Sequence, residues 1–238
     1  MISFVVPAHN EARLLGRTLV AIHAAARGLA QLYELIVVDD ASTDGTAAIA
    51  HANGARVVRV QFRHIARTRN AGARAATGST LIFVDADTIV SAATVRATIE
   101  ALRQGAVGGG ATIGFDGRLP LWAWLLLPVF RGVLRVGRVA AGCYVFCSRA
   151  AFDAIGGFDE RLYAAEEIAF SRTLRQQGSV VILRESVTTS GRKLRAHSGW
   201  EVLRLCAGLA RRGTALVRSR ERLSLWYGDR RDDPDLPQ

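Results

Sequence analysis

Short runs of apolar residues alternate with longer amphipathic stretches along the first third of the chain. The apolar runs are typical of buried strands and span 2–6, 34–38, 55–60 and 79–84. Between them, the patterning predicts helices over 11–29, 45–53 and 64–77. Strands and helices that alternate in this way form a parallel sheet with helices on both faces. We therefore expect an α/β fold, a Rossmann-type α/β/α sandwich with a mainly parallel central sheet.

The alternation loosens after residue 105. Further strands are predicted over 106–115, 142–148 and 180–183, and further helices over 121–139, 164–178 and 197–227. The glycines of 106–115 do not have the GxGxxG spacing of a dinucleotide-binding loop. No internal repeat or low-complexity linker divides the chain, so we expect one domain over 1–228 and a flexible tail over 229–238.

Polar and acidic residues follow three of the predicted parallel strands. The segments are PAHNE (7–11), DDASTDGT (39–46) and DADT (85–88). Each segment alone is explained equally well by helix capping, since Ser, Thr and Asp are preferred there. Ligands, however, bind beyond the carboxyl ends of parallel strands, and four acids gathered at one edge repel unless a cation or hydrogen-bond donors satisfy them. A ligand site is therefore the better interpretation of Asp39, Asp40, Asp85 and Asp87.

Composition indicates which classes of binding partner and which cellular compartment to expect. The 238 residues carry a formal charge of +10, which favours an anionic partner such as a phosphorylated ligand or an acidic membrane surface. Aromatic residues are not interleaved with the basic ones as on a base-stacking surface, so nucleic acid is not expected. Three cysteines without CxxC spacing suit a reducing compartment. No signal peptide is expected, and the longest apolar run, 121–130, is about half of the 20 residues that a membrane span needs.

Four segments together resemble the family 2 glycosyltransferases, which are inverting, nucleotide-sugar-dependent enzymes. They are SFVVPAHNEARLL (3–15), IVVDDASTDGT (36–46), RTRNAGARAATGSTLIFVDAD (67–87) and GGFDERLYAAEEIAFSRTLRQQG (156–178). The likeness covers about 2–190 and implies the GT-A fold. It divides the catalytic domain into a nucleotide-sugar-binding half (1–90), an acceptor-side half (91–190) and a basic C-terminal helical region (191–228).

The resemblance also implies which residues hold the sugar donor. Pro7, Ala8, His9 and Glu11 match the loop that surrounds the nucleoside, and the second acid of the VVDD segment, Asp40, matches the contact to the base. Asp39 is then a supporting neighbour. Arg69 matches a segment from which an arginine approaches the diphosphate, whereas a solvated helix face is the better interpretation of Arg67.

Asp85, Ala86 and Asp87 match the DxD motif of the family, which holds Mn²⁺ or Mg²⁺ on the donor diphosphate. The chemistry suits these residues, because hard divalent cations prefer oxygen ligands and neutralise charge on a departing phosphate. Asp87 is the expected direct ligand, and Asp85 reaches the metal or the ribose. His197 is a further candidate ligand, although a lone histidine more often has no such role. Arg192 is expected to close over the diphosphate or to face an anionic membrane.

The catalytic base is expected at the start of the helix over 164–178. Inversion requires a carboxylate that takes the proton of the acceptor hydroxyl. The family commonly has Glu-Asp here, and this chain has Glu166-Glu167. Glu167 occupies the matching position and is our first choice, with Glu166 as the alternative. Acids are also favoured in the first turn of any helix, which is the structural alternative.

The acceptor is the least determined part. The QxxRW motif of processive synthases is absent, which favours transfer of a single hexose. The apolar, arginine-flanked helix over 121–139 predicts either a peripheral membrane contact that receives a lipid-linked acceptor or a helix packed over the sheet. Either suits a cytoplasmic protein, the first at the inner face of the cell membrane. The competing functions are a non-catalytic nucleotide-sugar-binding protein and a nucleotidyltransferase, although the latter's phosphate loop is missing from 7–15.

Overall fold

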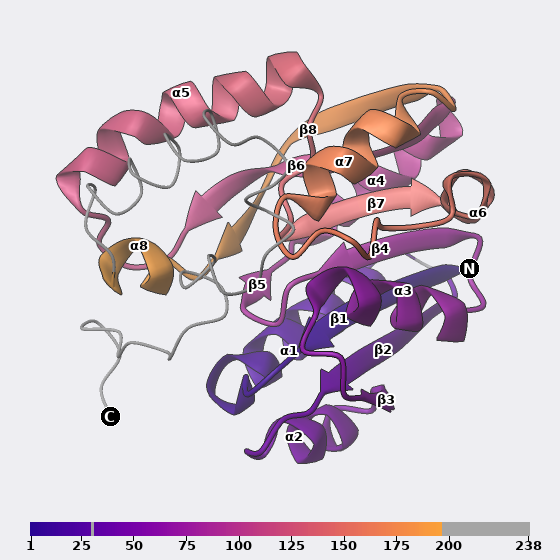
Figure 1. Ribbon diagram of the computed structural model, residues 1–238, viewed down its shortest axis with the longest axis vertical. Helices are drawn as coiled ribbons and strands as arrows, with labels where there is room; N and C mark the ends of the chain where they lie inside the picture. The colour runs from indigo at the N-terminus through magenta and orange to yellow at the C-terminus, as the bar shows by residue number, and fades with distance from the viewer. Residues whose placement is uncertain (30, 197–238) are drawn as a thin grey trace.

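The structure is a computed structural model, and it describes residues 1–29 and 31–196 (Figure 1). Within these residues the chain forms eight strands and eight helices. The strands are β1 (Ile2–Ala8), β2 (Tyr33–Asp40), β3 (Arg56–Val60), β4 (Thr80–Val84), β5 (Thr88–Ile89), β6 (Ala106–Phe115), β7 (Tyr144–Ser148) and β8 (Ser179–Thr189). The helices are α1 (Ala12–Arg27), α2 (Thr46–Ala52), α3 (Ile65–Ala75), α4 (Ala92–Arg103), α5 (Leu121–Gly137), α6 (Arg149–Ile155), α7 (Glu166–Leu174) and α8 (Arg192–Ala196).

The strands of the described residues form one sheet in the order β3-β2-β1-β4-β7-β6-β8-β5. Four of its seven pairings are parallel and three are antiparallel, so the predicted mainly parallel sheet is confirmed. Strands β3, β2, β1 and β4 are contiguous and parallel. Their carboxyl ends therefore share one edge, and the loops that follow β1, β2 and β4 lie beside one another.

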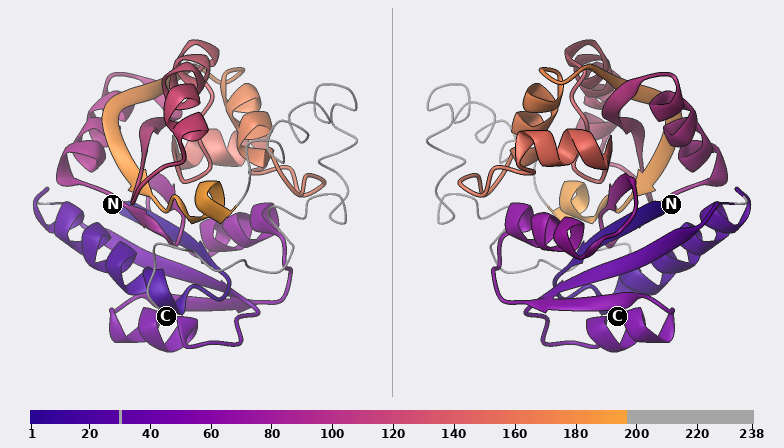
Figure 2. Two further views of the ribbon diagram at one scale, coloured as in Figure 1. Left: turned by 90° about the vertical axis from the view of Figure 1, so that its left-hand side faces the viewer. Right: turned by 90° about the vertical axis from the view of Figure 1, so that its right-hand side faces the viewer.

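Helices cover both faces of the sheet (Figure 2). In β1, Phe4 and Val6 pack with α1 and α4, whereas Val5 between them packs on the opposite face with α3, α6 and α7. Alternate residues of an apolar strand enter opposite cores because successive side chains point to opposite faces. This explains why the strand carries no polar residue on either face except Ser3, which is bonded to Glu34.

The observed elements differ from the predicted ones in two strands and two helices. Strand β7 lies antiparallel between β4 and β6. Strand β8 continues past residue 183 because it pairs with β6 again from Ser186 to Thr189, after a shift in register at 183–185. Helices α4 and α6 were not predicted, although each begins at a serine whose hydroxyl accepts an N–H bond, Ser91 and Ser148. The predicted helix over 197–227 and the tail over 229–238 lie outside the described residues.

The glycines of β6 allow the neighbouring backbone to pack closely against this strand. A Cβ on Gly109 would lie 1.9 Å from the carbonyl oxygen of Val181 in β8, and one on Gly110 would lie 2.8 Å from Ala140. No side chain fits at these positions. The glycines therefore allow β6 to pack between β7 and β8, and they do not form a phosphate-binding loop.

Helix α5 lies along the outside of the molecule and is connected to the end of β6 by residues 116–120 (Figure 1). It contains Pro128, and only Ala123 among its residues is fully buried. Over the part of the chain that the structure describes, no helix is both long enough and apolar enough to cross a membrane.

Candidate active site

Asp40, at the end of β2, is fully engaged by the chain around it. Its Oδ1 accepts N–H bonds from Phe62 (2.6 Å) and Arg63 (2.8 Å). Its Oδ2 accepts the N–H of His64 (3.0 Å) and the hydroxyl of Thr68 (2.7 Å). Burial would raise the pKa of Asp40, but these donors outweigh it and hold the pKa below the usual value. A carboxylate has about four acceptor sites, so these four donors use the capacity of Asp40.

Asp39 has more capacity left than its neighbour. It is buried, and its Oδ1 accepts one backbone N–H bond, from Ser42 at 3.2 Å. In the register of the sheet it lies opposite Ala8 of β1. The structure therefore places Asp39, rather than Asp40, where a carboxylate oxygen remains available beside the first-strand loop.

The first-strand loop is held by contacts with the segments that follow β2 and β3. The carbonyl of Asp40 lies 2.7 Å from Nδ1 of His9, and the guanidinium of Arg63 donates to Nε2 of the same ring at 2.6 Å. The backbone N–H of Glu11 donates to Thr46 at 2.8 Å. Pro7 and Ala8 complete β1 itself and are buried. Arg63 was not among the predicted site residues, because its contact with His9 joins loops 54 positions apart.

The two acids of the DAD segment each contact an arginine. Asp85 Oδ1 accepts a bond from Arg69 at 3.0 Å. Asp87 Oδ2 lies 3.0 Å from Arg192, and its Oδ1 accepts the hydroxyl of Thr189 at 3.3 Å. Arg192 also binds both carboxylate oxygens of Glu11, at 2.5 and 3.0 Å. The predicted residues Glu11, Asp87 and Arg192 are thus brought together from three distant parts of the chain.

Arg69 is the most buried charged side chain of this region, with 2% of its surface exposed. It binds Glu166 and Asp85 and also donates to the carbonyl of Gly142 at 2.8 Å. Burial would lower the pKa of Arg69, but the charges of these acids raise it above its usual value. The guanidinium therefore stays charged and connects the DAD segment to the start of α7.

Glu167 adjoins this buried ion pair. A Cβ placed on Gly142 would lie 3.7 Å from the carboxyl carbon of Glu167 and 3.4 Å from Arg69. Burial, followed by the negative charge of Glu166, raises the pKa of Glu167 from 4.5 to about 8. Glu166 is held by Arg69, so the two adjacent acids have different environments: one is ion-paired, and the other is poised to bind or release a proton near neutral pH.

The carboxylates of Asp85 and Asp87 suit a divalent cation that brings phosphate oxygens with it. No group of three or more metal-binding side chains is found among the described residues. Two aspartates at a strand end are nevertheless the hard oxygen donors that Mg²⁺ or Mn²⁺ takes alongside substrate phosphates and water. Ala86 between them is buried and spaces the two acids. His197, the other predicted ligand, lies outside the described residues.

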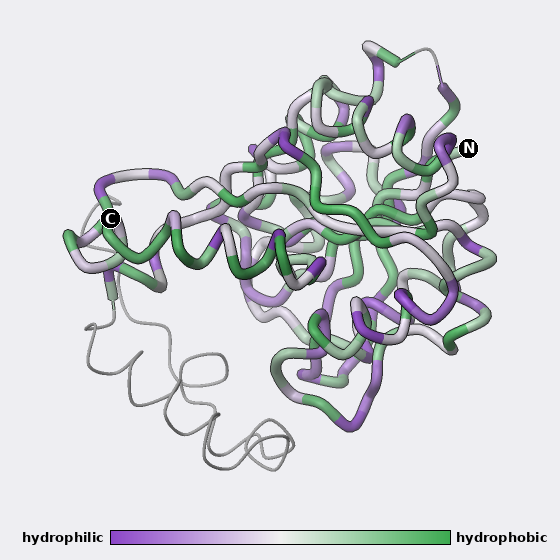
Figure 3. The backbone as a smooth tube through the Cα atoms, turned by 90° about the horizontal axis from the view of Figure 1, so that it is seen from above, coloured by the Kyte–Doolittle hydropathy of each residue, from purple (hydrophilic) through white to green (hydrophobic). Residues whose placement is uncertain are grey.

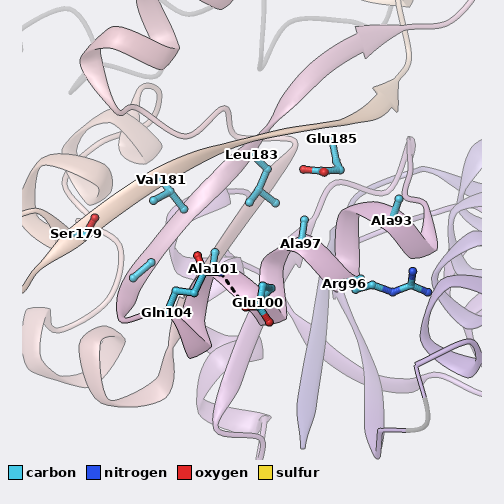
Figure 4. A pocket seen from close by; sticks show the side chains of 11 residues that line it. Ala93, Arg96, Ala97, Glu100, Ala101, Gln104, Ser179, Val181, Leu183 and Glu185 are labelled. Atoms are coloured by element: carbon cyan, nitrogen blue, oxygen red, sulfur yellow. Dashed lines mark hydrogen bonds between the residues drawn. The ribbon is translucent and has the colours of Figure 1, made fainter.

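A groove of about 700 Å³ lies on another part of the surface, between α4 and β8 (Figure 4). Its floor is apolar, with Ala97, Val181 and Leu183, and its rim carries Arg96 and Glu185. None of the predicted site residues is among its lining. It therefore does not form part of the acidic site.

Residues 3–155 match the family model described as "Glycosyl transferase family 2". The chain belongs to glycosyl transferase family 2. A curated relative, validoxylamine A glucosyltransferase of Streptomyces hygroscopicus subsp. jinggangensis (strain 5008), is 31% identical over 129 residues. That match covers 50% of this chain and 30% of the relative, so the likeness extends over less than a third of the relative's length.

Solved structures show that this family 2 chain has the GT-A fold. The mannosyltransferase PcManGT of Pyrobaculum calidifontis, in complex with GDP-Man and Mn²⁺, has a TM-score of 0.63 at 21% identity, covering 91% of this chain and 62% of that chain. S. aureus TarS (1–349) has a TM-score of 0.60 at 20% identity, covering 87% and 64%. Glucosyl-3-phosphoglycerate synthase from Mycobacterium tuberculosis has a TM-score of 0.56 at 26% identity, covering 92% and 79%.

Proposed function

We propose that the protein transfers a single hexose from a nucleotide-sugar donor to a hydroxyl acceptor, with inversion at the anomeric carbon. The observation that carries this proposal is the arrangement around Arg69. This one buried guanidinium joins Asp85 of the DAD segment to Glu166, next to which Glu167 has its raised pKa. A candidate proton acceptor is thereby fixed relative to a candidate metal-diphosphate site.

The nucleoside is expected to bind at the edge formed by β1 and β2. Pro7 and Ala8 supply an apolar surface, and Asp39 supplies a carboxylate that accepts hydrogen bonds from a ring N–H or from ribose hydroxyls. Asp40 stabilises the turn over 62–64. Arg63, in that turn, contacts His9, in the loop after β1. UDP or GDP is the expected nucleotide, because related folds have been solved with UDP and with GDP-Man.

Asp85 and Asp87 are the residues that would hold Mn²⁺ or Mg²⁺ on the donor diphosphate. Bound there, the cation neutralises charge on the leaving nucleoside diphosphate. Mn²⁺ accompanies the nucleotide or nucleotide sugar in two of the related structures. Arg192 already lies 3.0 Å from Asp87, so its guanidinium is close enough to add a hydrogen-bond donor for a phosphate oxygen.

In the chemical step, the acceptor oxygen attacks the anomeric carbon from the side opposite the diphosphate. Glu167 takes the hydroxyl proton as the new carbon–oxygen bond forms. The bond from the anomeric carbon to the diphosphate oxygen breaks, and the electron pair leaves with the nucleoside diphosphate. Glu166 remains paired with Arg69, and the negative charge of Glu166 raises the pKa of the neighbouring Glu167.

The test uses a panel of UDP-, GDP- and TDP-sugars with Mn²⁺ or Mg²⁺. Binding is measured by thermal shift, and cleavage by release of the nucleoside diphosphate. We expect the wild type to bind and slowly hydrolyse one donor, Glu167→Gln to bind it without hydrolysis, and the exposed control Glu100→Gln to behave as the wild type. Binding without cleavage by the wild type, even with added acceptors, would identify a nucleotide-sugar-binding protein. Release of pyrophosphate from a nucleoside triphosphate would identify a nucleotidyltransferase.

A further inference from the structure

Helix α5 is largely apolar in sequence and lies at the outside of the molecule (Figure 3), and many of its apolar side chains are exposed. Five of its exposed apolar positions are spaced by three or four residues and so lie on one face of the helix as an apolar stripe, namely Leu121, Leu125, Val129, Val133 and Val136. Among them, Leu121 is 73% exposed, Val133 is 63% exposed and Val136 is 88% exposed. Trp124, Leu126 and Phe130 are also exposed and extend the apolar surface beyond that face. An exposed apolar patch of this extent marks an interaction surface.

The inward side of α5 is fixed to the sheet by its arginines. Arg131 donates to the carbonyl of Ile113 at 2.7 Å. Arg135 donates to the hydroxyl of Thr112 at 3.0 Å and to the carbonyl of Leu183 at 3.2 Å. Since the polar side chains turn toward β6 and β8, the orientation that leaves the apolar stripe exposed is built into the fold.

The charge around α5 has a single sign. Residues 117–138 contain four arginines and no aspartate or glutamate, and the whole chain carries +10. Of these arginines, Arg131 and Arg135 bind the sheet, whereas Arg118 and Arg138 are exposed at the two ends of α5. An apolar stripe with exposed arginines at its ends is complementary to the interface of an anionic bilayer, where apolar side chains enter the headgroup boundary and arginines lie near the phosphates. The helix has 17 residues with Pro128 inside it, so it suits a position in the plane of the interface.

We propose that α5 docks the protein on an anionic lipid bilayer. The helix also adjoins the candidate site. Asp116, five positions before its first residue, donates its backbone N–H to the carbonyl of Thr189 at 3.0 Å, and the hydroxyl of Thr189 contacts Asp87. If the proposed transfer is correct, docking through α5 brings the site to the membrane surface, and the acceptor is a hydroxyl compound carried on a lipid. The docking itself does not depend on that transfer.

The test is co-flotation of the full chain with vesicles of phosphatidylglycerol and phosphatidylcholine, or of phosphatidylcholine alone. Val133→Glu, on α5, is compared with Val20→Glu, on α1, because the two valines are 63% and 59% exposed. We expect the wild type to float with the anionic vesicles at low salt and less at high salt. Val133→Glu should lower the partition coefficient about tenfold or more, since it replaces one buried apolar side chain by a charge, and Val20→Glu should not change it.

The outcomes are distinguishable. Melting curves and nucleoside diphosphate release from the donor establish that both variants are folded and that the acidic site is intact. Failure of the wild type to float at low salt, or equal flotation of the two variants, overturns the proposal. Concentration-dependent dimerisation that Val133→Glu abolishes, without flotation, would assign the stripe to a second copy of the chain instead. Donor hydrolysis is measured without vesicles, so failure of the proposed transfer leaves the flotation result unaffected.

Discussion

The environment of Glu167 predicts that one substitution abolishes transfer and also stabilises the fold. Its pKa is raised from 4.5 to about 8 in the folded protein, by burial and then by the charge of Glu166. The stability that comes from this raised pKa is fully present below about pH 4.5 and is lost as the pH rises through about 8. Glutamine has nearly the same shape and does not ionise, so Glu167→Gln should escape that loss.

The magnitude follows from the two pKa values. The difference between 4.5 and about 8 sets an upper bound of about 5 kcal/mol at 1.36 kcal/mol per pKa unit. Structural relaxation and the coupling to Glu166 reduce this bound, and we expect about 2 kcal/mol in favour of the variant at pH 9. For a chain of this size that corresponds to a rise of about 4–8 °C in Tm. At pH 5 the carboxyl is protonated in the folded protein, so the rise should nearly vanish.

The assay is thermal unfolding of the wild type, Glu167→Gln and the exposed control Glu100→Gln at pH 5 and pH 9, with transfer measured on the same samples. Other titrating groups are common to the three proteins, so the difference between them isolates position 167. We expect transfer by Glu167→Gln to fall by a factor of about 10²–10⁴, as for loss of a general base. A Tm difference that is equal at the two pH values, or a destabilisation at pH 9, would refute the assignment of a raised pKa to Glu167.

Four further predictions concern the rest of the site. Asp40→Asn should lower the free energy of unfolding, measured by chemical denaturation, by about 2–4 kcal/mol at pH 7, because an amide cannot accept all four donors. The pKa of Asp40 is lowered in the folded protein, so the stability difference between wild type and variant should shrink as the pH falls below 3.8. Asp39→Asn should leave unfolding unchanged while weakening nucleotide binding about tenfold in calorimetry, and the opposite pattern would return the base contact to Asp40. Arg69→Met should move the rising limb of the pH profile of kcat/KM to higher pH, because Arg69 lowers the pKa of Glu167; an unmoved limb would limit Arg69 to a structural role. Asp87→Ala should remove the Mn²⁺ dependence of donor binding in calorimetry without lowering Tm, and retained dependence would exclude Asp87 as the ligand.

Sequence patterning predicted the first half of the fold well because parallel strands buried on both faces are continuous apolar runs. The run LIFV (81–84) illustrates this, since it ends where Asp85 begins and the structure ends β4 at Val84. Helix α4 was missed because its sequence is rich in alanine and threonine, which weakens the apolar periodicity, although Ser91 supplies an N-cap. The antiparallel insertion of β7 depends on pairing with β4, residues about sixty positions away, and no local pattern reports such a partner.

The candidate site divides in the same way. The positions of the acids were predictable, because polar residues at the ends of parallel strands must share an edge. The side chains that these acids contact were not predictable. The sequence shows Arg69 as one basic residue on a basic helix, and it does not show that the side chain is buried between Asp85 and Glu166. The VVDD segment also does not show that the carboxylate of Asp40 is bonded to the turn over 62–64. That contact depends on how β3 ends beside β2.

The burial of Arg69 constrains how this protein can diverge. Loss of the arginine would leave two carboxylates without their cation, and loss of Glu166 or Asp85 would leave the buried guanidinium without one of its two counterions. Positions 69, 85 and 166 should therefore change jointly among homologues, as one inherited unit. An engineered change of the chemistry at position 167 would therefore have to keep the residues at 69, 85 and 166.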